Sequence, residues 1–283
     1  MTSAGTSGGG VAPAGTARTV RPRLVASDLD GTLLRPDGTI SDRTARTLAA
    51  LHQARIDVVF VTARPPRWVD EVAHAVAGHG VVVCLNGAFV YEPAAGRVLE
   101  AHPIGDALVR EIVGDLRAAL PGAAFAVEGV AGIASEEHFD HGEHPVPHGA
   151  PVGLLVEELL DGSAGKLLVR CRGTSTDALV ARVEEVLAGR AVVANSGAVG
   201  LAEVCGPDVS KGIALARWAA SRGVAPHEVW AFGDMPNDLP MLRWAGRAFA
   251  VANAHPEVLA AAHEVCGSNA DDGVAARLEM LLT

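Results

Sequence analysis

Short apolar runs alternate with longer amphipathic stretches along most of the chain. Runs of four or five apolar residues that end in polar or glycine residues are typical of buried strands in a parallel sheet. We interpret five such runs as strands of one sheet, at residues 24–27, 57–61, 81–85, 229–233 and 248–251. Because helical stretches such as residues 42–54 separate them, the pattern predicts an α/β fold with a doubly wound parallel sheet.

Between the third and fourth runs the pattern changes to that of a second unit. It predicts helices and strands at residues 106–120, 123–127, 166–171, 176–188 and 191–194. We therefore expect a small α+β domain at residues 91–199, inserted into a core made of residues 21–90 and 200–283. Residues 1–20 are small and glycine-rich, which predicts a disordered tail and not a signal peptide.

Two carboxylates stand two residues apart where the first predicted strand ends. Asp28 and Asp30 follow that strand directly, and Gly31 lets the backbone turn away after them. Carboxylates held this close repel each other unless they share a proton or bind a hard cation such as Mg²⁺. A capped turn is the alternative interpretation, because aspartate and glycine are common turn residues.

Polar residues also follow other predicted strands of the core. Thr62 ends the second run, Asp234 follows the fourth, and Asn86 follows the third, where a hairpin turn is the natural local interpretation. Lys211 stands in the first turn of a predicted helix, where the helix dipole disfavours a cation, so a function would explain its position. Since parallel strands end at one edge of a sheet, we expect these groups to gather there.

The same residues occur in the order of a known superfamily. The motifs are DxDGTLL at residues 28–34, Thr62, Lys211 and GDxxND at residues 233–238, with further matching stretches at residues 252–254 and 269–275. On these motifs the chain resembles the haloacid dehalogenase superfamily of phosphatases, in the Cof-type branch that also includes the sucrose phosphate phosphatases. The resemblance covers residues 23–91 and 200–283 and implies a Rossmann-like core with an inserted cap domain.

This resemblance implies a role for each motif residue. Asp28 would be the nucleophile that forms an aspartyl phosphate, and Asp30 would be the general acid and then the general base. Thr62 and Lys211 would bind the phosphoryl group, and Lys211 would also keep the nucleophile ionised. Taken singly, Thr62 is better explained as a strand-end residue and Lys211 as a solvated lysine, but their joint occurrence favours a site.

Mg²⁺ is the cofactor that the resemblance implies. Its ligands would be the Asp28 carboxylate, the Asp30 backbone carbonyl and Asp234, with Asn237 and Asp238 as further ligands or as their neighbours. Asp238 is equally well explained as a charge at a helix N-terminus, and Asn237 as the residue that caps this helix.

Arg64 and Asn86 are expected to contact the substrate beside Thr62 and Lys211. Arg64 can bind an anionic group through two parallel hydrogen bonds, although the prolines that follow it also suit an exposed turn. The resemblance places Asn86 near the site. Many relatives carry glycine between the threonine and the arginine, whereas this chain has Ala63, which leaves open any role that needs an unusual backbone conformation there.

One loop of the predicted cap is rich in histidines and carboxylates. Residues 136–148 contain four of each, interrupted by glycine and proline. Their spacing matches no standard zinc site, so a solvated loop is favoured over transition-metal binding. Contact with a substrate stays open, because loops on rigid scaffolds often carry specificity.

Composition favours a cytoplasmic enzyme. A formal net charge of −10 argues against a nucleic acid partner, which would need basic patches. The sequence holds no run of about eighteen apolar residues, so no membrane span is expected. The four cysteines lie far apart without zinc spacing and are expected to be free thiols of a reducing compartment. We expect a monomer or a homodimer.

The sequence therefore predicts a Mg²⁺-dependent phosphatase that hydrolyses a small phosphorylated metabolite, either a sugar phosphate or a phosphorylated cofactor. A phosphomutase is the alternative with related chemistry, which the position of the cap disfavours by family analogy. A catalytically idle metabolite-binding module is the alternative of another class. The presence of both Asp28 and Asp30 counts against it.

Overall fold

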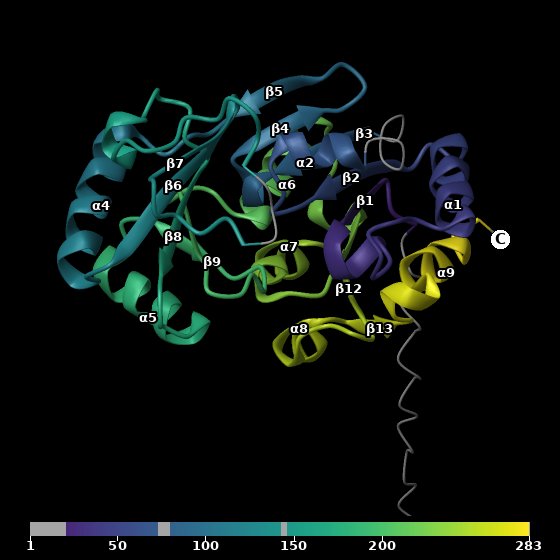
Figure 1. Ribbon diagram of the computed structural model, residues 1–283. Helices are drawn as coiled ribbons and strands as arrows, with labels where there is room; N and C mark the ends of the chain where they lie inside the picture. The colour runs from purple at the N-terminus through teal and green to yellow at the C-terminus, as the bar shows by residue number, and fades with distance from the viewer. Residues whose placement is uncertain (1–20, 73–79, 143–145, 283) are drawn as a thin grey trace, which may run out of the picture.

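Two sheets, each with its own helices, make up the protein (Figure 1). The computed structural model describes residues 21–72, 80–142 and 146–282 of the 283-residue chain. The tail predicted at residues 1–20 lies outside the described residues. No helix in the described part of the chain combines the length and the apolar character needed to cross a membrane.

The larger sheet has the strand order β13-β12-β11-β1-β2-β3-β4-β5. Its strands are β1 Leu24–Ser27, β2 Asp57–Val61, β3 Gly80–Cys84, β4 Phe89–Glu92, β5 Arg97–Ala101, β11 Val229–Gly233, β12 Arg247–Val251 and β13 Glu264–Cys266. The six strands from β13 to β3 are parallel, and β4 and β5 continue the sheet antiparallel. Along the chain the sheet extends from β1 to β3 on one side of β1 and from β11 to β13 on the other, and this change of direction opens a crevice at the carboxyl ends of β1 and β11.

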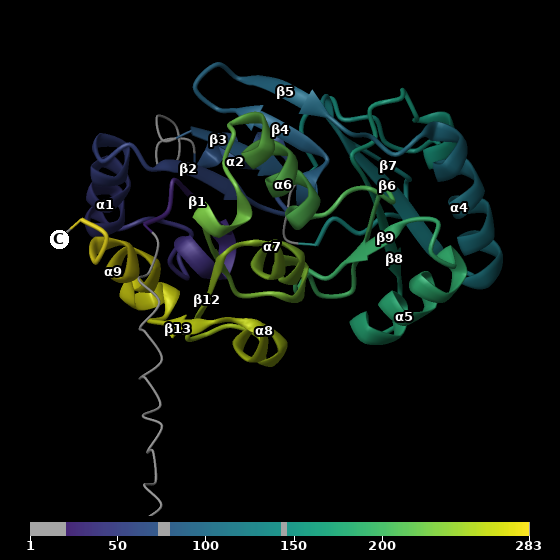
Figure 2. The same ribbon diagram turned by 180° about the vertical axis from the view of Figure 1, so that it is seen from behind.

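Helices cover both faces of this sheet. They are α1 Asp42–Gln53, α2 Pro66–Glu71, α6 Lys211–Ser221, α7 Leu239–Trp244, α8 Pro256–Ala261 and α9 Gly273–Glu279. The pair α6 and α7 lies in front of the sheet in the view from behind (Figure 2), whereas α1 packs against α9. Ser210 starts α6 by accepting a hydrogen bond from the Ile213 N–H at 3.2 Å. Stacked rings of Phe232 and Phe249, 4.7 Å apart, fill the core between the strands and helices.

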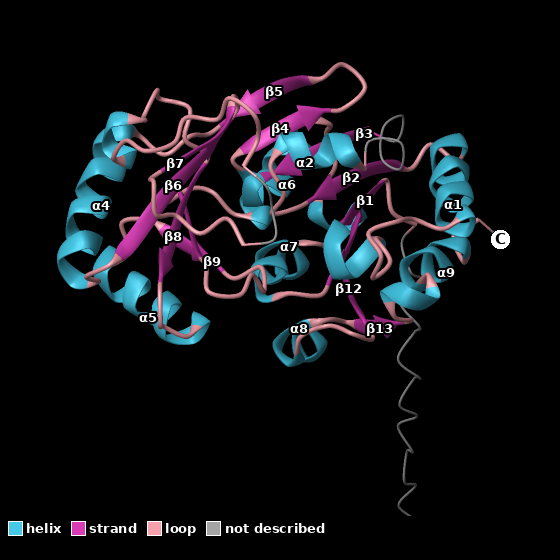
Figure 3. Ribbon diagram, in the orientation of Figure 1, coloured by secondary structure: helices cyan, strands magenta, loops and turns pink. Residues whose placement is uncertain are grey.

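The smaller sheet is antiparallel and has the order β7-β6-β8-β10-β9. Its elements are α4 Asp106–Ala119, β6 Ala123–Gly129, β7 Gly132–Ser135, β8 Lys166–Cys171, α5 Thr176–Leu187, β9 Val192–Ala194 and β10 Ala202–Cys205. Helices α4 and α5 cover its outer face (Figure 3). Alternation along β8 sends Leu167 and Val169 into the core under these helices, whereas Lys166, Leu168 and Arg170 line a cavity on the other face.

The predicted α/β fold with a second, smaller unit is confirmed, and the predicted core strands are shifted by no more than one residue. The sheet membership of two short strands differs from the expected division at residues 91 and 199. β5 hydrogen-bonds to β4 in the larger sheet, and β10 hydrogen-bonds to β8 in the smaller one. Each of these strands belongs to the sheet that contains its hydrogen-bonded neighbour, and its own apolar pattern does not show which sheet that is.

Candidate active site

A tight turn at the end of β1 carries the first two carboxylates. Residues Leu29–Leu33 form a single π-type turn, and Gly31 within it has φ of +75°. A Cβ atom at Gly31 would lie 2.3 Å from Asp234 Oδ2, so this glycine admits both the backbone conformation and the close approach. The turn leaves Asp28 buried and Asp30 exposed.

Lys211 is the first residue of α6 and lies between two carboxylates. Its Nζ atom donates to Asp28 Oδ1 and to Asp238 Oδ1, both at 2.6 Å. Burial alone would lower the pKa of Lys211, but the charges of Asp238 and Asp28 outweigh burial and raise it above its usual range. The lysine is therefore charged, and two carboxylates compensate for its unfavourable place at a helix N-terminus.

The loop after β11 brings two further carboxylates to the same point. Asp234 Oδ1 accepts from the Thr32 hydroxyl at 2.8 Å. Asp238 Oδ2 accepts from the backbone N–H groups of Asp234 and Met235 at 2.9 and 3.0 Å. Asp238 thus fixes the conformation of the loop that presents Asp234, which is more than the helix-terminus charge considered from the sequence.

The three buried aspartates carry more charge than the lysine neutralises. Asp28, Asp234 and Asp238 each offer an oxygen within 4.8 Å of the others. Burial raises the pKa of Asp28 well above its ordinary value, and burial together with repulsion from Asp238 raises the pKa of Asp234 to about 6. With all three ionised, three carboxylates less one ammonium would leave a charge of −2, which a divalent cation would balance.

Asn237 supplies a second indication of a cation site. Its Oδ1 atom is buried without a hydrogen-bond partner. Its Nδ2 atom donates to Asn86 Oδ1 at 3.0 Å, which leaves the carbonyl oxygen as the free acceptor. A hard cation takes such oxygen ligands, so this residue set fits a divalent metal ion.

Asp30 and Arg64 form a two-pronged ion pair across the mouth of the site. Arg64 Nε and Nη2 donate to Asp30 Oδ2 and Oδ1 at 2.7 and 2.6 Å. Thr62 is fully buried, and its Oγ1 accepts from the backbone N–H of Arg64 at 3.1 Å. Both Arg64 and Thr62 line the same cavity as Asp28.

Asn86 lies in a short turn that joins the antiparallel strands β3 and β4, as the hairpin interpretation predicts. Its backbone has φ of 57°, a conformation that asparagine tolerates better than most residues. The side chain is buried and contacts Asn237 and Cys205. Asn86 is thus beside the site and positions Asn237, while the expected substrate contact stays a prediction.

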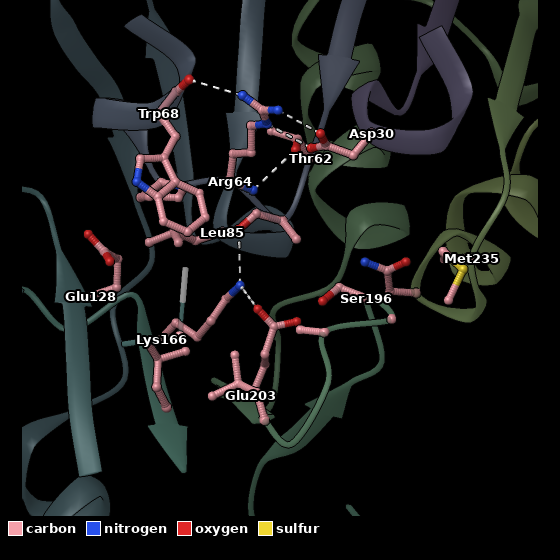
Figure 4. A pocket seen from close by; sticks show the side chains of 18 of the residues that line it. Asp30, Thr62, Arg64, Trp68, Leu85, Glu128, Lys166, Ser196, Glu203 and Met235 are labelled. Atoms are coloured by element: carbon pink, nitrogen blue, oxygen red, sulfur yellow. Dashed lines mark hydrogen bonds and ion pairs between the residues drawn. The ribbon is translucent and has the colours of Figure 1, made fainter. Parts of the chain in front are cut away.

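A cavity of about 690 Å³ opens above these groups between the two sheets (Figure 4). Its lining combines Asp28, Lys211 and Asp234 of the larger unit with Lys166 and Glu203 of the smaller one. Several contacts join the units around it, and two of them involve charged side chains that line the cavity or lie at its rim. Lys166 Nζ donates to the backbone carbonyl of Ala63 at 3.0 Å, and Arg67 forms two hydrogen bonds with Glu128 at 2.9 and 3.0 Å.

The histidine-rich loop contributes His141 to this cavity. His141 Nε2 lies 3.1 Å from Ser135 Oγ, and its ring meets Phe139 edge-on. Burial lowers the pKa of His141. In the ranges that the structure describes, Asp28, Asp234 and Asp238 form the one group with metal-ligand spacing. The described part of the histidine-rich loop therefore holds no group of side chains spaced to bind a metal ion.

Sequence reasoning gave no role to several residues that hold the site together. Thr32 lies inside the first motif, and its position there was the available sign of a role. Asn253 belongs to a later matching stretch, and its Nδ2 donates to the Gly31 carbonyl at 2.8 Å. Lys166 and Glu203 stand in short strands of the smaller sheet, and no motif marks them.

Comparisons with known sequences agree with this geometry. The sequence pattern of the haloacid dehalogenase-like hydrolases matches residues 25–278. Pyridoxal phosphate phosphatase YbhA of Escherichia coli is 26% identical, over 89% of this chain and 96% of that protein. 5-Amino-6-(5-phospho-D-ribitylamino)uracil phosphatase YitU of Bacillus subtilis is 29% identical, over 90% of this chain and 96% of that protein.

Solved structures show the same fold. SMU.1108c from Streptococcus mutans aligns with a TM-score of 0.80 at 22% identity, over 92% of this chain and 99% of its own. The sugar phosphatase BT4131, of subclass IIB of the superfamily, aligns with a TM-score of 0.72 at 19% identity, over 91% and 98%. Since the family pattern extends from β1 to α9 and the motif residues meet at one edge of the sheet, the chain belongs to the haloacid dehalogenase-like hydrolase family, as its motifs predict.

Proposed function

We propose that this protein is a Mg²⁺-dependent phosphatase that hydrolyses a small phosphorylated metabolite through an aspartyl phosphate. The observation that carries the proposal is the buried Lys211 held between Asp28 and Asp238 at the base of a cavity large enough for a small metabolite. A buried carboxylate beside a fixed ammonium suits attack on phosphorus, because phosphoryl transfer depends mainly on positioning and charge stabilisation.

In this mechanism the free oxygen of Asp28 attacks phosphorus, and the bond from phosphorus to the leaving oxygen breaks. Lys211 neutralises charge on the phosphoryl group while it holds Asp28 Oδ1. Asp30 gives its proton to the leaving oxygen and later takes one from the water that releases phosphate. Since both Asp30 oxygens accept from Arg64, this role requires at least one of these hydrogen bonds to open when substrate enters.

Mg²⁺ would be held by Asp28, the Asp30 backbone carbonyl, Asp234 and Asn237, with Asp238 fixing the loop that carries the last two. When bound, it supplies positive charge to the phosphoryl oxygens. The charge of −2 that the buried groups would carry when ionised and the unpartnered Asn237 Oδ1 support this set. Asp238 has both oxygens engaged by Lys211 and backbone N–H groups, so we place it beside the metal.

The relatives support a metabolite of modest size as the substrate. Those compared above are named for pyridoxal phosphate and for a phosphoribitylaminouracil, and another is an HMP-PP phosphatase. By their example we propose a sugar phosphate or a phosphorylated cofactor for this chain.

Phosphate release from a panel of such metabolites, with Mg²⁺ and with a chelator, tests the proposal. We expect turnover that requires Mg²⁺, and we expect Asp234→Ala to lower both activity and Mg²⁺ affinity, with part of the rate restored by excess Mg²⁺. Asp208→Ala, at an exposed aspartate before α6, is the control and should keep both. No release from any phosphomonoester would overturn the proposal in favour of a binding module.

A further inference from the structure

The inner face of the smaller sheet carries charges where a purely structural face would be apolar. Lys166 and Arg170 of β8 and Glu203 of β10 line the cavity, and Glu203 is paired in register with Leu168. The opposite face of the same strands is apolar and packs under α4 and α5. Period-two alternation therefore places these charged groups above the phosphoryl site, facing a bound leaving group.

Glu128, Lys166 and Glu203 on this face have charged partners within the protein, whereas Arg170 donates only to the backbone carbonyls of Val199 and Gly200 and its Nε atom is buried without a partner. Glu128 uses both oxygens to accept from Arg67. Lys166 donates to the Ala63 carbonyl and to Glu203 Oε1, the latter at 2.5 Å. The remaining oxygen, Glu203 Oε2, is buried and has no hydrogen-bond partner.

An unpartnered carboxylate oxygen at this depth needs an explanation. The Glu203 side chain is only 8% exposed, so bulk water reaches little of it. Leaving a buried acceptor without a hydrogen bond lowers stability, and more so when the acceptor is charged. Figure 4 shows one Glu203 oxygen turned to Lys166 and the other turned away from it, on the side of the cavity.

We infer that Glu203 Oε2 accepts a hydrogen bond from the leaving group of the substrate. The substrate class is then a phosphomonoester whose alcohol part carries a hydroxyl or N–H donor that reaches Glu203. This inference rests on the proposed phosphatase function and adds a residue that determines specificity. Arg67 and Lys166 are already neutralised by Glu128 and Glu203, so neither offers a free charge to an anionic group beside Glu203 Oε2. Arg170 lines the same cavity and donates to the backbone carbonyls of Val199 and Gly200, with no ion pair among the described residues, so an anionic group is disfavoured only close to Glu203 Oε2.

The test compares matched substrates in wild type and in Glu203→Gln. Each hydroxylated phosphomonoester is paired with an analogue of the same ring size without hydroxyls, such as glucose 6-phosphate with cyclohexylmethyl phosphate. We expect wild type to favour the hydroxylated member by at least about tenfold in kcat/KM, and Glu203→Gln to remove most of this preference. The variant keeps the volume of the side chain and loses the anionic acceptor.

Glu128→Gln is the matched control, since it removes the same charge from the same face at a residue whose oxygens are both occupied. It should change kcat/KM of both members of a pair by one common factor. If Glu203→Gln also lowers both members equally, Glu203 merely joins the two units and the inference is wrong. An equal preference of wild type for both members would overturn it too, whereas no phosphate release from any member would contradict the proposed function itself.

Discussion

Three buried aspartates around one lysine set the properties of individual residues in this site. Lys211 contacts Asp28 and Asp238 directly, while Asp234 is held by the Thr32 hydroxyl. The raised pKa values of Asp28 and Asp234 show that ionising both in the absence of a metal is costly. A site whose carboxylates repel each other when no metal is bound favours the binding of a cation. Replacing one of these carboxylates should therefore lower activity and raise stability.

Asp28→Asn should abolish turnover and leave the fold intact. The amide cannot attack phosphorus, so kcat should fall at least about a hundredfold. The melting temperature should stay the same or rise, because the amide carries no ionisation cost and Lys211 keeps its contact with Asp238. Steady-state kinetics and thermal unfolding measure both. Asp57→Asn, at the exposed end of β2 far from the site, should change neither, and more than about one hundredth of wild-type activity in Asp28→Asn would refute the nucleophile assignment.

Mg²⁺ affinity should tighten as pH rises through about 6. In the metal-free protein the pKa of Asp234 is raised to about 6 from 3.8, so the folded state holds a proton that the unfolded state has lost. This carboxyl therefore costs stability progressively as pH rises from about 4 to about 6, and Mg²⁺ relieves the cost by replacing the proton.

Between pH 5 and pH 7 one displaced proton corresponds to about a tenfold lower Kd for Mg²⁺. Calorimetric titration at several pH values measures this change in Kd. Comparing the binding enthalpy in buffers of different ionisation enthalpy gives the number of protons released on binding. Asp234→Asn should bind Mg²⁺ more weakly and with a flatter pH profile. The same Kd at both pH values in wild type would show that Asp234 ionises without a metal.

At the scale of elements, the turn after β1 and the loop after β11 depend on each other through Gly31. Gly31→Ala should place its Cβ 2.3 Å from Asp234 Oδ2 and push this carboxylate out of position. We expect a loss of about tenfold or more in kcat and a higher Mg²⁺ requirement, beyond about 1 kcal/mol of lost stability from the positive φ.

Gly38→Ala separates the two effects, because Gly38 has φ of +79° and nothing within 4 Å of an added Cβ. It should lose similar stability and keep full activity. Equal kinetic defects in the two variants would mean that backbone strain, and not the contact with Asp234, explains the result at Gly31.

The elements of the core were predictable because their arrangement follows from local rules. Apolar runs mark β1, β2 and β11, and parallel strands necessarily bring Asp28, Thr62 and Asp234 to one edge. The smaller sheet was less predictable, since β10 joins β8 from a distant part of the chain and no local pattern encodes that pairing. The position of Glu203 in the cavity therefore could not be predicted from the sequence. The contact between Thr32 and Asp234 could not be predicted either, because it depends on how the turn after β1 packs.

On the scale of the whole molecule, the cavity divides the proposed work between two units. The larger sheet contributes Asp28, Lys211 and Asp234 to the lining. In the proposed function Asp28 and Lys211 would meet the phosphoryl group that all substrates share, and Asp234 would hold the metal. The smaller sheet and its loop contribute Glu203 and His141 to the lining, where they would meet the leaving group that differs between substrates. Arg67 with Glu128 and Lys166 with the Ala63 carbonyl hold the two halves together around the cavity.

This division predicts two kinds of kinetic defect. Lys211→Met should lower kcat/KM for every phosphomonoester by a similar factor of about a hundred to a thousand, because it removes charge stabilisation from the common group. His141→Ala should lower kcat/KM less, by a factor that differs between substrates, and should change the order in which the enzyme prefers them. Lys211→Met leaves Asp28 and Asp238 facing each other without a cation, which can destabilise the fold. The double variant Lys211→Met with Asp238→Asn removes one positive and one negative charge together, and it is measured in the same assay. Specificity constants over the whole panel decide the matter: a reordered panel in the lysine variants beside a uniform loss in His141→Ala would assign the two units the opposite roles.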